Sequence, residues 1–188
     1  MNILVIDNHD SFVYNLVHYL EGYGHHITVK RPIQVEKINI ENFDKILLSP
    51  GPGLPDQADE LMKAIDLWHN EKPMLGVCLG HQALASYFGA ELCNLDTITH
   101  GISSLLYVED YTDALFEDLP KKLDVGRYHS WIVDEKTFPE ELVCTAVNSQ
   151  GLIMAFRHRS LPIFGIQFHP ESILTPNGRQ IISNWLKT

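Results

Sequence analysis

Three residue types that together can cleave an amide bond stand in two short segments of this sequence. The first segment is Gly76-Val77-Cys78-Leu79-Gly80, in which a cysteine has a glycine two positions away on each side. A cysteine thiolate is an effective nucleophile for acyl groups. The second segment, Gln167-Phe168-His169-Pro170-Glu171, carries a histidine and a carboxylate two residues apart. A nucleophile, a base and a group that orients the base are the parts that covalent acyl transfer requires.

The surroundings of Cys78 are those of a nucleophile elbow. An aliphatic run from Pro73 to Val77 predicts a buried strand, and the segment from Leu79 to Phe88 predicts a helix that Gly89 ends. The flanking glycines keep side chains out of a crowded turn, and a helix N-terminus beside the sulfur favours the thiolate. A buried structural cysteine is the alternative, but the strand–turn–helix context favours a nucleophile.

His169 follows another aliphatic run, Ile163 to Phe168, which predicts a strand. Pro170 favours extended backbone, so the side chains of His169 and Glu171 should point the same way, with the carboxylate accepting a hydrogen bond from the imidazole. Taken alone, the segment fits a loop histidine beside an exposed glutamate equally well. In combination with Cys78 it predicts the base and its orienting group.

The turn Ser49-Pro50-Gly51-Pro52-Gly53 also follows a strand-like run. Its prolines fix the backbone and its glycines allow close approach to a ligand, so it can aim backbone N–H groups at a developing oxyanion. A stiff loop without such a role is the alternative. Gln82 lies one helical turn after Cys78 and can face the same pocket, or it is an ordinary surface glutamine.

The elements that must position these residues change in type along the chain. The first half alternates strand-like runs with helical periodicity, which predicts a parallel sheet with helices on both faces. The strands are expected at Asn2 to Asp7, His26 to Lys30, Lys45 to Ser49 and Pro73 to Val77, and the helices at Phe12 to Leu20 (capped by Ser11), Ala58 to His69 and Leu79 to Phe88. The second half adds short strands and a final helix: Leu105 to Glu109, Leu123 to Tyr128, Leu142 to Asn148, Leu152 to Arg157, Ile163 to Phe168, and the helix Asn177 to Leu186.

We therefore predict an α/β fold in a single domain, residues 1–188. Its sheet should be open, mainly parallel and flavodoxin-like, flanked by helices, with an additional antiparallel portion of short strands.

Composition excludes several classes of function. The net charge of -10 disfavours a nucleic-acid partner, because an acidic chain repels phosphates. No apolar stretch approaches the ~20 residues of a membrane span, and the N-terminus lacks the pattern of a signal peptide. Three cysteines are an odd number and predict reduced thiols in a cytoplasmic protein. Zinc-ligand spacing and the G-x-G-x-x-G nucleotide fingerprint are both missing from the sequence.

Five segments together resemble the class I, triad-type glutamine amidotransferases. They are Asp7 to Phe12 (DNHDSF), Ser49 to Gly53 (SPGPG), Gly76 to Gln82 (GVCLGHQ), Gly126 to Trp131 (GRYHSW) and Phe168 to Ser172 (FHPES). They occur in the order of the family and span nearly the whole chain. The first segment, together with Thr99-His100-Gly101 and RYHS, resembles the branch that contains the small subunits of anthranilate synthase and aminodeoxychorismate synthase.

The resemblance implies a role for each matched residue. Cys78, His169 and Glu171 would form the triad, and backbone N–H groups of Gly53 and Leu79 the oxyanion hole. Contacts to L-glutamine would come from Gly51, Pro52, Gly53, Leu79, Gln82, Ser130 and Trp131. The position of Trp131 is often leucine in this branch; a backbone contact would tolerate the change, whereas the large ring could alter the pocket rim or the subunit contact.

The resemblance also implies the surroundings of the reaction. This chain would need no metal or cofactor, and its ammonia would pass to a large chorismate-binding synthase subunit, which would need magnesium. Two other classes of function stay open from the residues themselves. One is a stand-alone cysteine hydrolase of γ-glutamyl substrates; the other is a receiver-like binding domain that uses Asp7 and Asp10.

Overall fold

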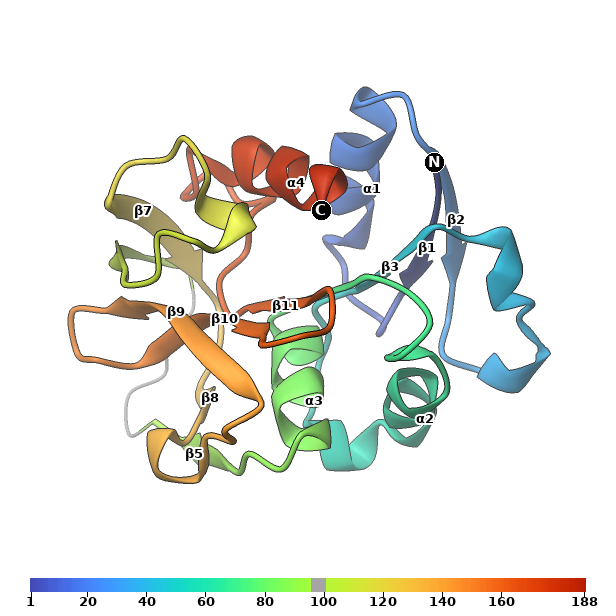
Figure 1. The fold of residues 1–188 in the computed structure, drawn as a ribbon, viewed down its shortest axis with the longest axis horizontal. Coiled ribbons are helices and arrows are strands. Elements are labelled where there is room, and N and C mark those ends of the chain that lie inside the picture. Colours follow the sequence, from blue (N-terminus) through green and yellow to red (C-terminus); the bar gives the residue numbers. More distant parts are fainter. Residues whose placement is uncertain (96–100) are drawn as a thin grey trace.

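A mixed sheet with helices on both faces forms the centre of the molecule (Figure 1). The computed structural model describes residues 1–95 and 101–188. Within these ranges nine strands form one sheet in the order β2-β1-β3-β4-β11-β10-β9-β6-β7. One part is parallel and consists of β2 (His26–Lys30), β1 (Asn2–Ile6), β3 (Lys45–Leu48), β4 (Met74–Val77) and β11 (Ile163–Ile166). The other part is antiparallel and consists of β10 (Ile153–His158), β9 (Leu142–Asn148), β6 (Ile102–Val108) and β7 (Lys122–Arg127).

Strand β11 joins the two parts, because it pairs parallel with β4 and antiparallel with β10. A small separate sheet pairs β5 (Leu92–Asn94) with β8 (Trp131–Val133). Short 3-10 turns connect the main elements at Val35–Lys37, Ile40–Asn42, Pro55–Gln57, Ala114–Phe116 and Glu135–Thr137.

In the described part of the chain, two α-helices cover each face of the sheet (Figure 1). Helices α1 (Val13–Gly22) and α4 (Gly178–Lys187) lie on one face, and α2 (Asp59–Trp68) and α3 (Leu79–Tyr87) on the other. Alternate side chains of β1 divide between these layers: Ile3 and Val5 pack towards α1 and α4, while Leu4 and Ile6 pack towards α2 and α3. The period of two along a strand therefore builds both cores at once.

The predicted fold class is confirmed, and so is the strand–helix alternation of the first half. The strands β5 and β8 were missed, because three residues are too few to show a periodic pattern. The prediction that Ser11 caps the first helix is wrong. Phe12 occupies the N-cap position without a capping hydrogen bond from its side chain, and its N–H donates to the carboxylate of Asp10 at 3.1 Å. An aspartate that bonds backbone two residues ahead competes with a serine cap, so the helix begins later.

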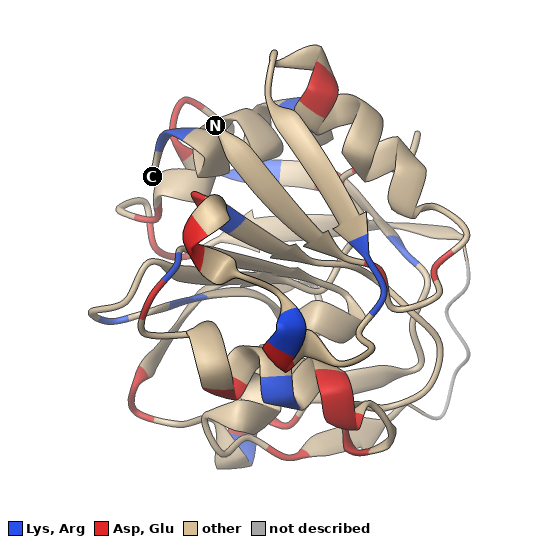
Figure 2. Cartoon of the chain, turned by 90° about the vertical axis from the view of Figure 1, so that its right-hand side faces the viewer, with Lys and Arg blue, Asp and Glu red and all other residues tan. Residues whose placement is uncertain are grey.

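Charged residues are dispersed over the surface. On the face drawn in Figure 2, acidic and basic residues are interspersed over helices and loops. No helix among the residues the structure describes is long and apolar enough to span a membrane.

The parallel arrangement brings four loops together at one edge of the sheet. The carboxyl ends of β1, β3, β4 and β11 lead into the segments that begin at Asp7, Ser49, Cys78 and Gln167. Parallel strands that are hydrogen-bonded to one another end on the same side, where ligands bind in sheets of this kind. Residues far apart in the sequence, such as those that follow β1 and those that follow β11, are neighbours for this reason.

Very close packing between α3 and the sheet sets the position of this edge. A Cβ on Gly80 would lie 2.3 Å from the carbonyl oxygen of Leu48, and one on Gly76 would lie 2.4 Å from the carbonyl oxygen of Gly80. Both obstacles are backbone atoms, which cannot move aside as a flexible side chain can. The glycines on either side of Cys78 therefore let the first turn of α3 lie directly on β3 and β4.

We predict that Gly80→Ala destabilises the fold. Overpacking of this kind costs about 1–3 kcal/mol or more in the free energy of unfolding. The matched control is Gly22→Ala at the end of α1, where nothing lies within 4 Å of the added Cβ; alanine there should stabilise by up to ~1 kcal/mol. Denaturant unfolding of both variants checks the prediction, which fails if the two behave alike.

Candidate active site

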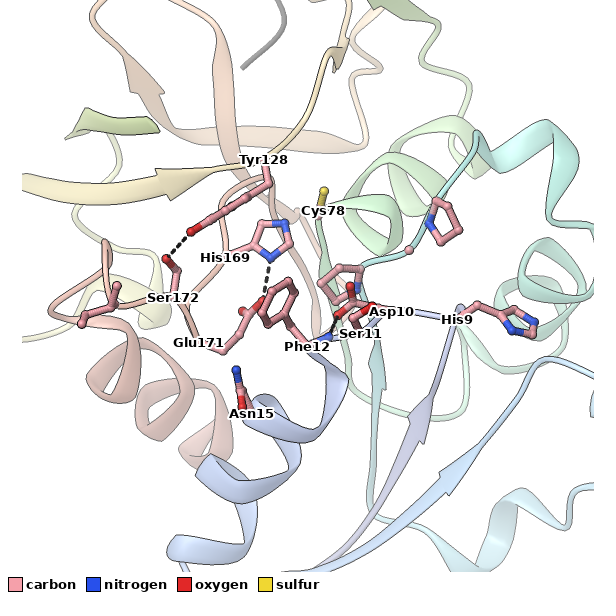
Figure 3. A pocket seen from close by; sticks show the side chains of 14 residues that line it. His9, Asp10, Ser11, Phe12, Asn15, Cys78, Tyr128, His169, Glu171 and Ser172 are labelled. Atoms are coloured by element: carbon pink, nitrogen blue, oxygen red, sulfur yellow. Dashed lines mark hydrogen bonds and ion pairs between the residues drawn. The ribbon is translucent and has the colours of Figure 1, made fainter. Parts of the chain in front are cut away.

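A cavity of about 750 Å³ opens where the carboxyl ends of the parallel strands meet (Figure 3). Its walls come from the loops after β1, β3, β4 and β11, together with the start of α1 and the end of β7. The lining residues are His9, Asp10, Ser11, Phe12, Asn15, Pro50, Gly51, Pro52, Cys78, Tyr128, His169, Glu171, Ser172 and Ile173. The three residues predicted to cleave an amide bond thus line one cavity.

Cys78 occupies the sharp turn between β4 and α3. Its backbone has φ 52 and ψ -101, a conformation that residues with a side chain rarely adopt. The turn is held from both sides, because the N–H of Cys78 donates to Ile166 at 2.9 Å and its carbonyl accepts from the N–H of Gln82 at 3.0 Å. The strand–turn–helix prediction is confirmed, and the sulfur stands beside the N-terminus of α3 and in the cavity.

His169 and Glu171 form a buried pair. Imidazole Nδ1 and carboxylate Oε1 are 2.6 Å apart, and the two residues are only 6% and 7% exposed. Because a carboxylate can only accept in this pair, Nδ1 carries the proton, and Nε2 of the neutral ring can accept one. Nε2 is buried, makes no hydrogen bond of normal geometry to a described residue, and belongs to a ring that interacts with the Cys78 thiol.

The charges around His169 favour its protonated form. Burial lowers the pKa of His169, but the interactions of the ring with the nearby Cys78 thiol and with the carboxylate of Glu171 outweigh burial and raise the pKa to about 10. An imidazolium between two acidic groups is stabilised in this way. A proton taken from the thiol can therefore be kept on the imidazole.

The pairing of His169 with Glu171 is as predicted, but the predicted reason is wrong. The backbone at Pro170 is not extended: residues 170 and 171 lie in a turn, across which the N–H of Ser172 donates to the carbonyl of His169 at 3.3 Å. The chain must bend here to reach α4, since Gly178 packs so closely on Pro170 that a Cβ would lie 1.7 Å from its carbonyl oxygen. The turn, rather than strand alternation, brings the two side chains together.

The turn after β3 is fastened to the loop after β1. The N–H of Asn8 donates to the hydroxyl of Ser49 at 2.9 Å, and its side-chain amide donates to the Ser49 carbonyl at 2.9 Å. A Cβ on Gly51 would lie 2.4 Å from the carbonyl oxygen of Asn8, so only glycine fits between the two loops. Gly51 and Pro52 line the cavity, whereas Gly53 lies beyond them in the exposed part of the turn with φ 83.

The remaining residues predicted to contact glutamine lie outside the cavity lining. Leu79 is buried directly after Cys78 and begins α3. Gln82 is also buried, and its amide donates to the carbonyl of Trp131 at 2.8 Å and to Gln167 at 3.1 Å. Ser130 and Trp131 lie at the start of β8 and are partly exposed. The structure therefore brings Gln82 and Trp131 together, next to the site rather than within its cavity.

Several cavity residues were not identified as site residues from the sequence. Tyr128 and Ser172 belong to segments that resemble the family, yet no role followed for either from the motifs alone. Phe12 and Asn15 come from the first turns of α1, and Asn15 points towards Glu171 in Figure 3. Burial raises the pKa of Asp10, the second carboxylic acid of the cavity. Of the segment Thr99-His100-Gly101, the first two residues lie outside the described part of the chain.

The other two cysteines have different surroundings. Burial raises the pKa of Cys144 to about 11, and burial followed by the charge of Asp134 raises the pKa of Cys93. A thiol with a raised pKa is a poor nucleophile. In the described part of the chain, no three His, Cys, Asp or Glu residues gather as metal ligands would.

Comparison with known proteins agrees with this geometry. The sequence model of the family glutamine amidotransferase class-I matches residues 4–188. Aminodeoxychorismate/anthranilate synthase component 2 of Bacillus subtilis is 43% identical over 188 residues, 99% of this chain and 96% of the relative. Anthranilate synthase component 2 of Haemophilus influenzae is 42% identical, and aminodeoxychorismate synthase component 2 of Klebsiella aerogenes 41%; the matches cover 98% of this chain and 97% and 98% of those proteins.

A solved structure shares the same fold. It is described as a candidate GMP synthase component from Thermoplasma acidophilum, and it superimposes with a TM-score of 0.88 at 27% identity, covering 100% of this chain and 92% of that one. The chain belongs to the class-I glutamine amidotransferases and is an enzyme of that class. The receiver-like interpretation of Asp7 and Asp10 is thereby set aside.

We predict that His169→Ala lowers the rate of glutamine hydrolysis by ~10²–10⁴-fold, the usual contribution of a general base. Glu171→Gln should cost less, because an amide can still hold the ring, although it stabilises the imidazolium less well. Glu21→Gln, on the exposed side of α1, is the matched control. Steady-state glutamate formation ranks the three variants. A lower rate for Glu171→Gln than for His169→Ala would contradict an orienting role for Glu171.

Proposed function

We propose that this chain is the glutaminase subunit of an anthranilate synthase. In this role it hydrolyses L-glutamine through a cysteinyl thioester and delivers ammonia to a large subunit that aminates chorismate. The observation that carries the chemistry is the single cavity that holds the Cys78 elbow and the 2.6 Å pair of His169 and Glu171. Support for the assembly comes from relatives named as component 2 of two synthases, which match this chain from end to end.

The reaction begins with attack of the Cys78 sulfur on the side-chain amide carbon of glutamine. The thiol proton goes to Nε2 of His169, whose imidazolium the carboxylate of Glu171 stabilises. As the tetrahedral intermediate collapses, the carbon–nitrogen bond breaks, and the imidazolium donates its proton to the departing nitrogen. Ammonia leaves and a glutamyl thioester remains. A water molecule, deprotonated by His169, then cleaves the thioester and releases glutamate.

Backbone donors would hold the oxyanion of that intermediate. The first N–H groups of a helix have no partner within the helix, so the N–H of Leu79 at the start of α3 is one suitable donor. The N–H of Gly53 would be the second donor. Gly53 has a φ of 83°, a conformation that glycine adopts without strain. We place the glutamine itself against Gly51, Pro52, Gly53, Leu79, Gln82, Ser130 and Trp131. For glutamine to bind there, the side-chain amide of Gln82 would have to release the carbonyl of Trp131 and contact the substrate instead.

The half-reaction on this chain needs no metal or cofactor in our proposal, since sulfur, imidazole and backbone N–H groups perform each step. Magnesium would serve the partner subunit, and the complex would be cytoplasmic.

Ammonia in bulk water near neutral pH is mostly protonated and is then no nucleophile. Its direct transfer from the cavity to the partner keeps it unprotonated, and this requirement favours a heteromeric enzyme over a stand-alone hydrolase of γ-glutamyl substrates.

A second function, the small subunit of aminodeoxychorismate synthase, is favoured by one specific observation. The Bacillus subtilis relative carries both names, and the Klebsiella aerogenes relative carries that name alone at nearly the same identity. One subunit that serves two synthases would explain this pattern. Isolation of the large subunit that co-purifies with this chain, followed by identification of its product, distinguishes the cases.

We predict that Cys78→Ala abolishes glutamine-dependent product formation by the complex but leaves the activity with added ammonium salt intact. The alanine removes the nucleophile, whereas the chemistry of the partner does not involve it. Cys93→Ala and Cys144→Ala are the matched controls, because neither thiol lines the cavity. Product formation is measured with each nitrogen source. Full glutamine-dependent activity in the Cys78 variant would overturn the assignment.

We further predict that the partner controls the glutaminase. The turn from Pro50 to Gly53 presents only backbone donors to the oxyanion, and rotation of one glycine peptide would remove a donor, which costs ~10²-fold or more in rate. The isolated chain should therefore hydrolyse glutamine slowly. Addition of the large subunit, especially with chorismate, should accelerate glutamate formation more than ~10-fold. An isolated chain that already works at the rate of the complex favours the stand-alone hydrolase.

A further inference from the structure

The segment that carries His169 is fastened to β7 at several points. His169 and Gly126 form an isolated antiparallel bridge, in which the N–H of His169 donates to the Gly126 carbonyl at 3.1 Å. The hydroxyl of Thr175 links the same two residues, because it donates to the His169 carbonyl at 2.6 Å and accepts from the N–H of Gly126 at 2.9 Å. A Cβ on Gly126 would lie 2.8 Å from the hydroxyl of Ser172, so the two segments are in direct contact.

Tyr128 extends this attachment from the backbone to the imidazole. Its ring lies edge-on to the ring of His169, with centroids 4.9 Å apart and an interplanar angle of 64°. Its hydroxyl lies 2.9 Å from the hydroxyl of Ser172, which also accepts from the N–H of Leu174 at 3.1 Å. Figure 3 shows Tyr128 beside His169 at the cavity, on the side of the ring away from α1. Edge-to-face contacts of this kind are favourable and directional.

We propose that Tyr128 is a positioning residue for the catalytic base. The bond to Glu171 fixes Nδ1 of His169, but a single hydrogen bond leaves the ring free to pivot about it. The edge-on tyrosine restricts that pivot, and the Ser172 hydroxyl holds the tyrosine in place. Nε2 is thereby kept directed at Cys78, whose thiol it must deprotonate. The base is thus aligned by the antiparallel part of the sheet, while the nucleophile belongs to the parallel part.

The inference rests on the proposed role of His169, and the two can be tested separately. In the unaltered chain, rapid alkylation of Cys78 by iodoacetamide at acidic pH tests the thiolate–imidazolium pair itself. The variants of Tyr128 test only how that pair is aligned. Both measurements use the full chain and need no partner. Cys93 and Cys144 serve as internal standards, because the raised pKa of each makes it slow to react at that pH.

We predict that Tyr128→Leu lowers kcat for glutamine hydrolysis about tenfold or more, since small misplacements of a reacting group are costly. KM should change little, and alkylation of Cys78 should require higher pH. Tyr128→Phe keeps the ring and should lose about fivefold, the equivalent of one neutral hydrogen bond. Ser172→Ala should lower kcat by a similar factor. The double variant Tyr128→Phe/Ser172→Ala should lower kcat no more than either single variant does. Tyr111→Leu, at a residue that is 60% exposed and outside the cavity, is the matched control.

Thermal unfolding shows which variants remain folded. If Tyr128→Leu does not fold, Tyr128→Phe tests the proposal in its place. Three results would overturn it. An unchanged kcat shows that the ring is dispensable, and a raised KM at constant kcat assigns the ring to substrate binding. A reduced kcat with an unchanged pH profile of alkylation shows that Tyr128 acts somewhere other than on the base.

Discussion

Everything at the site depends on how closely the first turn of α3 approaches the sheet. Cys78 can stand at a turn with φ 52 only if the strand before it and the helix after it are both held in place. The missing side chains of Gly76 and Gly80 supply that condition, because each glycine lies against backbone atoms that leave no room for a Cβ. The strained turn persists because packing on both sides determines it, and it places Cys78 in the cavity, directly before the start of α3.

His169 reaches this cavity by a different route. His169 follows β11, the strand at which the sheet changes from parallel to antiparallel. Its backbone pairs with β7, at the far end of the strand order, and the chain then turns sharply towards α4. Cys78 and His169 are thus held by different parts of one sheet. A movement between those parts would alter their alignment without breaking either one, which is what the proposed control by a partner subunit would require.

Much of the site could be predicted, and where the structure differs from the prediction the physical cause is similar. Cys78 was found because an elbow is a local feature: strand, glycine, turn and helix all lie within a few residues. The partnership of His169 and Glu171 was found for the wrong reason, since close packing of Gly178 on Pro170 imposes a turn that the proline alone did not suggest. Helical spacing predicts that Gln82 can face the pocket; its amide is bound to Trp131 and Gln167 beside the cavity, and its contact with glutamine stays a prediction. Both of these differences concern contacts between segments that are not adjacent in the sequence.

The sequence by itself determined the class of the protein, the alternation of strands and helices, and the residues able to carry the chemistry. These depend on periodicity, on turn residues and on the order of short motifs, all of which act over a few positions. Only the tertiary structure decided which side chains share the cavity, that Tyr128 lies against the base, and that β11 joins the two parts of the sheet. The reason is that strand order and side-chain contact depend on the packing of distant segments, which no local pattern encodes.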